Sequence, residues 1–422
     1  MPFSSLGLIP PLLRAVSDKS YTAPTEIQVA AIPVILRGHD VLGLAQTGSG
    51  KTAAFALPIL QRLQERPAQR PRTLHALILV PTRELAAQVG ESLVGYAQHL
   101  PNRPKMVTVF GGVSINPQML NLRGGADIII ATPGRLLDLI EHNAVRVAGV
   151  DILVLDEADR LLDLGFADEI NRILAMLPPQ RQNLFFSATF PSAVNALAGK
   201  ILHKPVRIVL EATADSAPDI QQRAIAVDAG KRTQLLRHLI QAHQWDRVLV
   251  FVATKYATEH VAEKLRRNGV DAMPFHGELS QGNRNQVLSE FRAATLPVLV
   301  ATDIAARGID IPQLAAVVNY DLPRSVTDYT HRIGRTGRAG QSGLAISFVN
   351  ADTEAHLRLI ENRLKLRLSR EQIVGFEPTT NADTKTMASA ALAIEQANGG
   401  VKSKRKSKKD KLREAAAGKR QS

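Results

Sequence analysis

The chain has 422 residues, enough for roughly two or three domains, and its composition of 45% hydrophobic and 22% charged residues is ordinary for a globular protein. It contains no cysteine, which excludes disulfides, zinc fingers and thiolate nucleophiles. Its net charge of +13 indicates a polyanionic partner, while the lack of a membrane-spanning apolar run or an export signal leads us to expect a cytoplasmic protein.

Short apolar runs alternate with amphipathic stretches, which predicts parallel strands joined by crossover helices. The expected strands of the first half are 40–45, 75–80, 106–110, 127–131, 151–155 and 183–187. Residues 211–219 are polar and small, which is typical of a linker. The second series is expected at 225–227, 248–252, 272–275, 298–301, 316–319 and 345–349, with a closing helix at 352–368. This pattern predicts two α/β domains, at 1–210 and 220–377.

Residues 378–422 lose the β-branched side chains and should form a disordered tail. Residues 401–422 hold ten Lys/Arg and two acidic residues, or +8 of the total +13, so the remaining chain carries +5. Nucleic acid and an anionic membrane surface both fit such a charge. The basic run at 402–411 would tether a nucleic acid without sequence choice. A solubilising tail or a nuclear-import signal is the alternative.

A phosphate-binding loop is predicted at residues 45–52, AQTGSGKT, between a strand and a helix. Glycines let backbone N–H groups surround phosphate oxygens at a helix N-terminus. Lys51 would reach the β- and γ-phosphates, and Thr52 would bind Mg²⁺. Ala45 replaces the first glycine of the general pattern. A glycine-rich turn is the alternative, but it does not account for the Lys-Thr pair.

Two carboxylates follow the expected strand 151–155, at the sheet edge where open α/β folds bind ligands. Asp156 is placed to hold Mg²⁺ through water, and Glu157 to orient or deprotonate an attacking water. An acidic helix start is the alternative for these residues. Together with the loop around Lys51 they predict a nucleoside triphosphatase.

Seven segments together resemble the DEAD-box ATP-dependent RNA helicases. They are AQTGSGKT (45–52), PTRELA (81–86), TPGR (132–135), DEAD (156–159), SAT (187–189), ATDIAARGID (301–310) and HRIGRTGR (331–338). The resemblance implies two tandem RecA-like domains that close when ATP and RNA bind and reopen after hydrolysis. It implies RNA-stimulated ATP hydrolysis coupled to this closure, local non-processive unwinding of RNA duplexes and remodelling of ribonucleoproteins. The opening FSSLGL and the short basic tail are most similar to the bacterial RhlE subgroup.

Residues 21–28 resemble the family's adenine-reading segment, with Ser20 where the family usually has glycine. A glutamine amide can pair with the N6/N7 edge of adenine, so Gln28 should select ATP. The resemblance implies that Tyr21 stacks on the base, Thr25 braces the phosphate loop and Phe3 lies near the base. The expected ATP contacts of the loop are Ala45, Gln46, Thr47, Gly48, Ser49, Gly50, Lys51 and Thr52.

RNA contacts are expected in loops after strands of the first domain, at Arg83, Gly111, Gly112, Thr132 and Arg135. The resemblance implies further RNA contacts in the second domain, at Thr254, Gly277, Arg284 and Thr302. Each alone also fits a solvated loop or a helix cap. No member is aromatic, so contacts should be to phosphates and 2′-OH groups of single strands and short duplexes, with little sequence preference.

The second domain is expected to complete the ATP site. Arg335 and Arg338 would stabilise charge on the transferred phosphoryl group, and would join Lys51, Asp156 and Glu157 as catalytic residues. The resemblance also places Gly308 and Asp310 at the nucleotide. It implies that a further set, Asp159, Ser187, Ala188, Thr189 and His331, couples hydrolysis to RNA binding.

The leading hypothesis is therefore an ATP- and Mg²⁺-dependent RNA helicase. An alternative from another class is an RNA clamp or annealing chaperone whose ATPase only times release. A DNA-translocating helicase is disfavoured by the DEAD tetrad and the Gln28 segment. Ribosome assembly, mRNA decay and cold adaptation are all compatible as settings.

Overall fold

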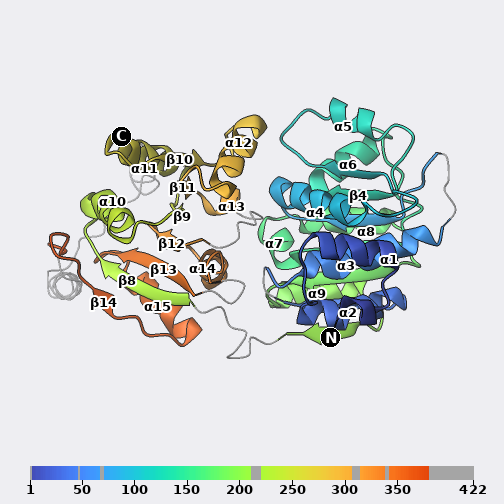
Figure 1. Ribbon diagram of the computed structural model, residues 1–422, viewed down its shortest axis with the longest axis horizontal. Coiled ribbons are helices and arrows are strands. Elements are labelled where there is room, and N and C mark those ends of the chain that lie inside the picture. Colours follow the sequence, from blue (N-terminus) through green and yellow to red (C-terminus); the bar gives the residue numbers. More distant parts are fainter. Residues whose placement is uncertain are drawn as a thin grey trace, which may run out of the picture.

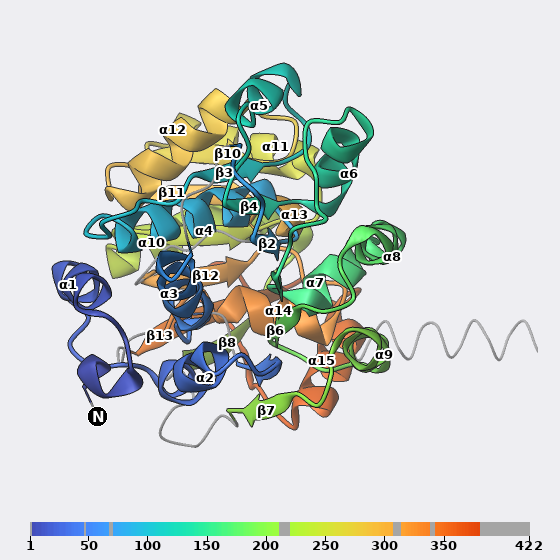
Figure 2. The same cartoon turned by 90° about the vertical axis from the view of Figure 1, so that its right-hand side faces the viewer.

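The computed structural model describes residues 2–45, 48–66, 71–210, 220–306, 314–337 and 342–379. It contains two parallel sheets of seven strands, each covered by helices on both faces, and the two units lie side by side (Figures 1 and 2). The expected fold class of two tandem RecA-like α/β domains is confirmed. None of the helices in these ranges is long and apolar enough to cross a bilayer.

The first sheet has the strand order β3-β4-β2-β5-β6-β1-β7. Its strands are β1 (Val41–Leu44), β2 (Ala76–Leu79), β3 (Met106–Val109), β4 (Ile128–Ala131), β5 (Ile152–Leu155), β6 (Gln182–Ser187) and β7 (Val206–Val209). A 3₁₀ turn at Phe3–Leu6 precedes its helices, which are α1 (Pro10–Asp18), α2 (Glu26–Leu36), α3 (Lys51–Gln64), α4 (Arg83–Tyr96), α5 (Asn116–Asn121), α6 (Pro133–Glu141), α7 (Ala158–Asp163), α8 (Ala167–Met176) and α9 (Ser192–Ile201).

The second sheet has the order β10-β11-β9-β12-β13-β8-β14, which repeats the order of the first. Its strands are β8 (Ile220–Ala226), β9 (Val248–Phe251), β10 (Ala272–Phe275), β11 (Val298–Ala301), β12 (Ala316–Asn319), β13 (Gly343–Val349) and β14 (Arg370–Glu371). Its helices are α10 (Arg232–His243), α11 (Lys255–Arg267), α12 (Gln281–Arg292), α13 (Asp303–Ala306), α14 (Val326–Ile333) and α15 (Glu354–Leu364). By position, β8 corresponds to β1 and β9 to β2.

Alternation along the strands builds a core on each face of each sheet. In β4, Ile128 and Ile130 pack with α1 to α4, whereas Ile129 packs with α6 to α9 on the opposite face. Successive side chains of a strand point to opposite faces, so strands that are apolar throughout are buried on both sides. The rigid sheets therefore hold the loops at their carboxyl ends in fixed positions.

Related helix starts occur at these carboxyl ends in both domains. Thr82 caps α4, and Thr254 caps α11, by accepting a hydrogen bond from the backbone N–H three residues later, at 3.2 Å and 3.1 Å. Such a cap satisfies an N–H group that has no partner within the helix. The cap therefore fixes the residue at which each helix begins after its strand, and with it the position of the charged residues in the first helical turn.

Two edge strands were absent from the sequence prediction. β7 is interrupted by Arg207 and is exposed except at Ile208, and β14 has only two residues, so neither shows a continuous apolar run. The strand expected at 225–227 begins earlier, at Ile220, because its polar first half is used in contacts such as Tyr329 Oη to Gln222 (3.0 Å). The closing helix is shorter than 352–368 because Lys365 takes a left-handed conformation (φ 54°).

The chain after α15 returns to the sheet beside β8. Arg223 of β8 pairs with Glu371 of β14 (2.5 Å), and the Asp228 carboxylate just after β8 accepts both the N–H (3.0 Å) and the hydroxyl (2.8 Å) of Thr379. The expected linker (211–219) and all but the first two residues of the expected tail lie outside the described residues. The proposed domain boundaries stay predictions.

Candidate active site

The segment predicted to bind phosphate lies at the carboxyl end of β1 and leads into α3. Gly48 and Gly50 have φ values of +85° and +93°, which favour glycine, as the predicted loop requires. Lys51 is buried, and its Nζ donates to the Ala45 carbonyl at 2.8 Å. Gln46 and Thr47 lie outside the described residues.

The predicted adenine-reading segment packs directly against this loop. Gln28 Nε2 donates to the Gly50 carbonyl (3.2 Å), and Gln28 Oε1 accepts the Thr25 N–H (3.0 Å). A Cβ on Gly50 would lie 2.4 Å from Gln28 Nε2 and 2.8 Å from Thr25 Oγ1, so only glycine fits there. A primary amide has two N–H groups and two acceptor lone pairs. Gln28 therefore retains one of each for a base.

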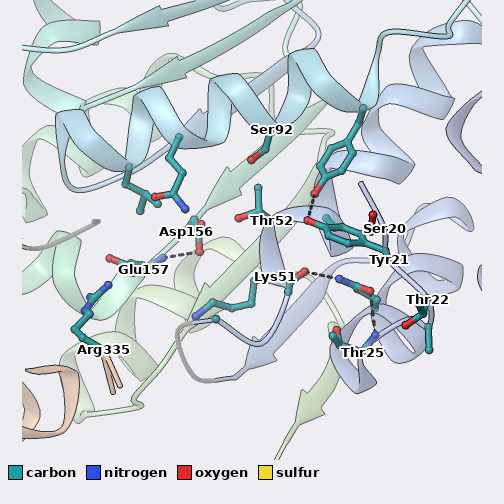
Figure 3. A pocket seen from close by; sticks show the side chains of 18 residues that line it. Ser20, Tyr21, Thr22, Thr25, Lys51, Thr52, Ser92, Asp156, Glu157 and Arg335 are labelled. Carbon is teal, nitrogen blue, oxygen red and sulfur yellow. Dashed lines mark hydrogen bonds between the residues drawn. The ribbon is translucent and has the colours of Figure 1, made fainter. Parts of the chain in front are cut away.

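A pocket of about 440 Å³ brings both segments together with the acidic pair (Figure 3). Its lining residues are Ser20, Tyr21, Thr22, Ala23, Thr25, Gln28, Gly48, Gly50, Lys51, Thr52, Ala53, Leu85, Gln88, Ser92, Tyr96, Asp156, Glu157 and Arg335. All of these but one come from the first domain. Arg335 follows α14 of the second domain and extends toward Glu157, so the pocket is shared between domains.

The two carboxylates of the pocket have different electrostatic surroundings. Burial raises the pKa of Asp156 to about 6, although nearby Lys51 opposes the shift. Burial would also raise the pKa of Glu157, but Arg160, Lys51 and Arg335 outweigh it and lower that pKa. Arg160 Nη1 donates to Glu157 Oε2 at 2.9 Å. Glu157 is therefore ionised at neutral pH and can accept a proton or a hydrogen bond.

The oxygen ligands in the pocket suit Mg²⁺ held partly by a substrate. Thr52 and Asp156 both line the pocket, and the described residues contain no cluster of three or more metal-ligating side chains. Mg²⁺ usually binds through one or two carboxylates together with substrate phosphates and water. The residues present fit such a site.

The predicted coupling residues of the first domain form one hydrogen-bonded cluster. The Asp159 carboxylate accepts the Thr189 N–H (2.9 Å) and hydroxyl (2.8 Å), and Ser187 Oγ accepts the Asp159 N–H (3.3 Å). Ser187 Oγ in turn donates to the Thr189 carbonyl (2.7 Å), and Ala188 lies between these two residues. Hydrogen bonds therefore connect the acidic loop after β5 to the loop after β6.

Arg332 and its neighbours in the second domain lie beside Arg160 of the first domain. Arg332 is buried and makes a bidentate ion pair with Asp303 (2.5 and 2.7 Å), with its guanidinium over the Phe251 ring. His331 and Arg335 line a small hollow together with Arg160 of the first domain. Arg338, Gly308 and Asp310 lie outside the described residues.

Most of the expected RNA contacts of the first domain gather in one place. Arg83 Nη1 donates to the Gly112 carbonyl (3.4 Å), and the Gly111 N–H donates to Thr132 Oγ1 (3.3 Å). Arg135 donates to the nearby Val113 carbonyl (2.7 Å). Arg135 is buried, so its guanidinium lies beneath this loop rather than on the surface.

The expected RNA contacts of the second domain differ in environment. Thr254 is exposed at the start of α11, and a Cβ added to Gly277 would have no atom within 4 Å, so both are accessible. Thr302 donates its backbone N–H to the Phe275 carbonyl (3.3 Å). Arg284 is buried and pairs with Glu84 of the first domain (2.5 Å). Its position is that of a contact between domains, and RNA contact by Arg284 stays a prediction.

The pocket and interface residues that were missed from the sequence include Glu84, Ser92, Tyr96 and Arg160. Arg160 lies three residues after Glu157 on α7, a spacing at which opposite charges meet. Ser92 and Tyr96 lie four residues apart on one face of α4, which reads as an ordinary amphipathic helix. Phe3 lies behind Tyr21, with ring centroids 6.5 Å apart, and does not line the pocket.

Comparison with known families shows two matches along the chain. The family model for DEAD/DEAH box helicases matches residues 25–197, and that for the helicase conserved C-terminal domain matches residues 230–340. The chain is 41% identical over 398 residues to the ATP-dependent RNA helicase DeaD of Mycobacterium tuberculosis (strain H37Rv), covering 94% of this chain and 69% of that protein.

Two Escherichia coli K12 helicases are similar to the same extent. The ATP-dependent RNA helicase DbpA is 40% identical over 403 residues, covering 95% of this chain and 86% of DbpA. DeaD is 40% identical over 375 residues, covering 89% of this chain but only 59% of DeaD. These names do not single out the RhlE subgroup, so that finer assignment stays a prediction.

Solved structures show the same architecture. Saccharomyces cerevisiae Dbp5 bound to RNA and ADP BeF₃ gives a TM-score of 0.78 at 30% identity, covering 93% of this chain and 99% of that one. A DEAD box protein from the hyperthermophile Methanococcus jannaschii gives 0.53 at 37% identity, covering 88% and 99%. The likeness to Dbp5 extends over both domains together.

Proposed function

Because the chain belongs to the DEAD-box family of ATP-dependent RNA helicases, we propose that it couples RNA-stimulated ATP hydrolysis to domain closure and local, non-processive separation of RNA duplexes. The observation that carries this proposal is the shared pocket. Lys51, Asp156 and Glu157 come from the first domain and Arg335 from the second, so hydrolysis requires both domains.

Each charged side chain of the pocket has a role in phosphoryl transfer. Lys51 and Arg335 place positive charge where negative charge develops on the transferred phosphoryl group. The ionised Glu157 orients an attacking water and accepts its proton. Thr52 and Asp156 would hold Mg²⁺, which neutralises phosphate charge when bound.

Domain closure is supported by two observations. The likeness to RNA- and ADP BeF₃-bound Dbp5 covers both domains in one superposition. Arg335 and Arg284 of the second domain both reach groups of the first. If ATP and RNA each bind better to this closed arrangement, each ligand strengthens the binding of the other.

RNA is proposed to lie along the loops that carry Arg83, Gly111, Thr132 and Thr254, with contacts mainly to sugar and phosphate. Exposed loops with small residues let a phosphate backbone approach their N–H groups. Ribosomal or RNA-decay complexes are compatible partners, and the cytoplasmic location stays a prediction.

The test compares Arg335→Ala and Glu157→Gln with the parent chain. Arg335→Ala should lower the RNA-stimulated kcat by about 10³-fold or more, because an arginine at this position acts on the transition state. Glu157→Gln should lower kcat by about 10²-fold or more while ATP and RNA still bind, which would accumulate a long-lived ternary complex.

Exposed charges of the first domain provide controls. Arg172→Ala and Glu141→Gln alter a surface ion pair of the first domain and should leave turnover unchanged. Full RNA-stimulated turnover by Arg335→Ala, or by residues 1–210 alone, would refute the shared site. ATP-independent annealing without ATP-dependent strand separation would favour the clamp or chaperone alternative.

A further inference from the structure

Tyr21, the residue expected to stack on adenine, is held by side chains rather than by regular secondary structure. It lies between α1 and α2, follows Ser20 with its positive φ of 57°, and is 41% exposed. Its backbone N–H donates a long hydrogen bond to the Val16 carbonyl (3.3 Å), which leaves the side chain unconstrained. The orientation of its ring must therefore come from its neighbours.

Two neighbours define that orientation. The Phe3 ring stacks near Tyr21 with an interplanar angle of 23°. The Tyr21 hydroxyl lies 3.3 Å from the Tyr96 hydroxyl, and both residues line the pocket. Phe3 does not line the pocket and Tyr21 does, so Phe3 supports the ring from behind.

Tyr96 is a rigid anchor for this contact. It occupies the last position of α4, is only 2% exposed, and has Lys19 Nζ 5.1 Å above its ring. Burial, and then the bond to Tyr21, raise the pKa of Tyr96, so its hydroxyl keeps its proton. The buried Tyr96 hydroxyl is hydrogen-bonded to a neutral group, so its effect on the site is to fix the position of that group.

We propose that Tyr96 is a positioning residue of the nucleotide site: its hydroxyl fixes the Tyr21 ring in the plane that the nucleobase stacks against. This inference rests on the proposed nucleotide site. Without the Tyr96 hydroxyl the Tyr21 ring is free to rotate, and the nucleobase then has to order the ring on binding. This ordering lowers the affinity for the nucleotide and leaves the rate of the chemical step unchanged.

The test is a double-mutant cycle of Tyr96→Phe and Tyr21→Phe, which remove one hydroxyl each and keep both rings. Affinity for a fluorescent ADP analogue and the KM for ATP should weaken about two- to tenfold in either variant, as expected for one neutral hydrogen bond. The double variant should be no weaker than either single one. The kcat at saturating ATP and RNA should stay within about twofold, because the proposed role precedes the chemical step.

Tyr320→Phe is the matched control, because Tyr320 is also buried and its hydroxyl lies 2.9 Å from that of Thr233, in the other domain. It should not change nucleotide affinity. Unchanged affinity in Tyr96→Phe, or additive losses in the double variant, would overturn the inference. Lys51→Ala distinguishes failure of the proposed nucleotide site from failure of the role of Tyr96. If Lys51→Ala leaves ADP binding intact, the proposed site itself is wrong. If Lys51→Ala abolishes ADP binding and Tyr96→Phe has no effect on it, only the role of Tyr96 is wrong.

Discussion

Glu84 and Arg284 form a buried ion pair between the two domains, although they lie 200 residues apart in the chain. Their side chains are 8% and 2% exposed. Arg284 also donates to the His276 carbonyl (2.9 Å) and lies over the Phe275 ring at 4.5 Å. Glu84 sits beside Arg83 on α4, so the pair joins the expected RNA surface of one domain to the other domain.

Glu84→Gln should weaken domain closure, because it leaves the Arg284 charge buried with a neutral partner. When the domains open, the Arg284 guanidinium is solvated again, which limits the energetic cost of the substitution. We therefore expect RNA-stimulated kcat/KM to fall moderately, on the order of tenfold. Distance measurements between dyes on the two domains should show fewer closed molecules with RNA and ATP bound. Glu91→Gln, on the exposed face of α4, is the control. Equal closure in Glu84→Gln and the parent would mean that the pair is incidental.

Gln28→Ala should reduce the preference for ATP over GTP. The free N–H and lone pair of the Gln28 amide would no longer meet adenine, a loss of about 1–3 kcal/mol for a bidentate base contact. The KM for ATP should rise, and that for GTP should change little. Gln286→Ala, on the exposed side of α12, controls for loss of a glutamine. An unchanged ratio of kcat/KM for ATP and GTP would exclude base reading by Gln28.

Gly50→Ala should abolish tight nucleotide binding. The new Cβ would lie 2.4 Å from Gln28 Nε2, and the residue would keep a φ of +93° that alanine rarely adopts. The phosphate loop and the adenine-reading segment would then have to separate. Gly199→Ala lies within α9 in open space and should be neutral or stabilising by up to about 1 kcal/mol. Isothermal titration with ADP measures the nucleotide affinity of the Gly50→Ala and Gly199→Ala variants. Normal ADP affinity in Gly50→Ala would contradict the close packing of Gly50 against Gln28.

Arg370→Met should destabilise the second domain in a pH-dependent way. Arg370 bonds both Glu354 and Glu361, at distances of 2.7–3.0 Å. These bonds lower the pKa of Glu361, and they lower that of Glu354 against the opposing effect of burial. Carboxylates with depressed pKa values stabilise the fold above their unfolded pKa, and that contribution is lost as pH falls through the folded pKa.

The difference in free energy of unfolding between the parent and Arg370→Met should therefore be largest at neutral pH. We expect about 1–3 kcal/mol there, because the ion pairs are partly exposed to solvent. This difference should decrease below about pH 4.5, where the glutamates become protonated. Urea unfolding at several pH values measures it. Arg363→Met on the same helix as the two glutamates is the control. A difference that is constant with pH would show that Arg370 acts by packing alone.

The sequence predicted the parts of this molecule that are dictated locally. Every strand except β7 and β14 was found from an apolar run, and the loop around Lys51 from glycines that need positive φ. The pairing of Glu84 with Arg284 could not be predicted, because it depends on how two domains meet. The resemblance predicts an RNA contact for Arg284, but a basic residue near a helix start gives no sign of the side chain that will pair with it. The Tyr21–Tyr96 contact was hidden for the same reason, since the spacing on α4 indicates only an amphipathic helix.

The repeated strand order has a consequence for binding stoichiometry. β8 occupies the place of β1, yet where β1 leads into the glycine-containing loop before α3, β8 leads to the Asp228 carboxylate, held by Thr379. Bonds from Thr379 lower the pKa of Asp228, so a fixed negative charge stands at this equivalent position. We therefore expect that one half of the duplicated scaffold binds the nucleotide and that the other half supplies an arginine to it. A titration of the full chain with ATP analogues should reach saturation at one nucleotide per molecule.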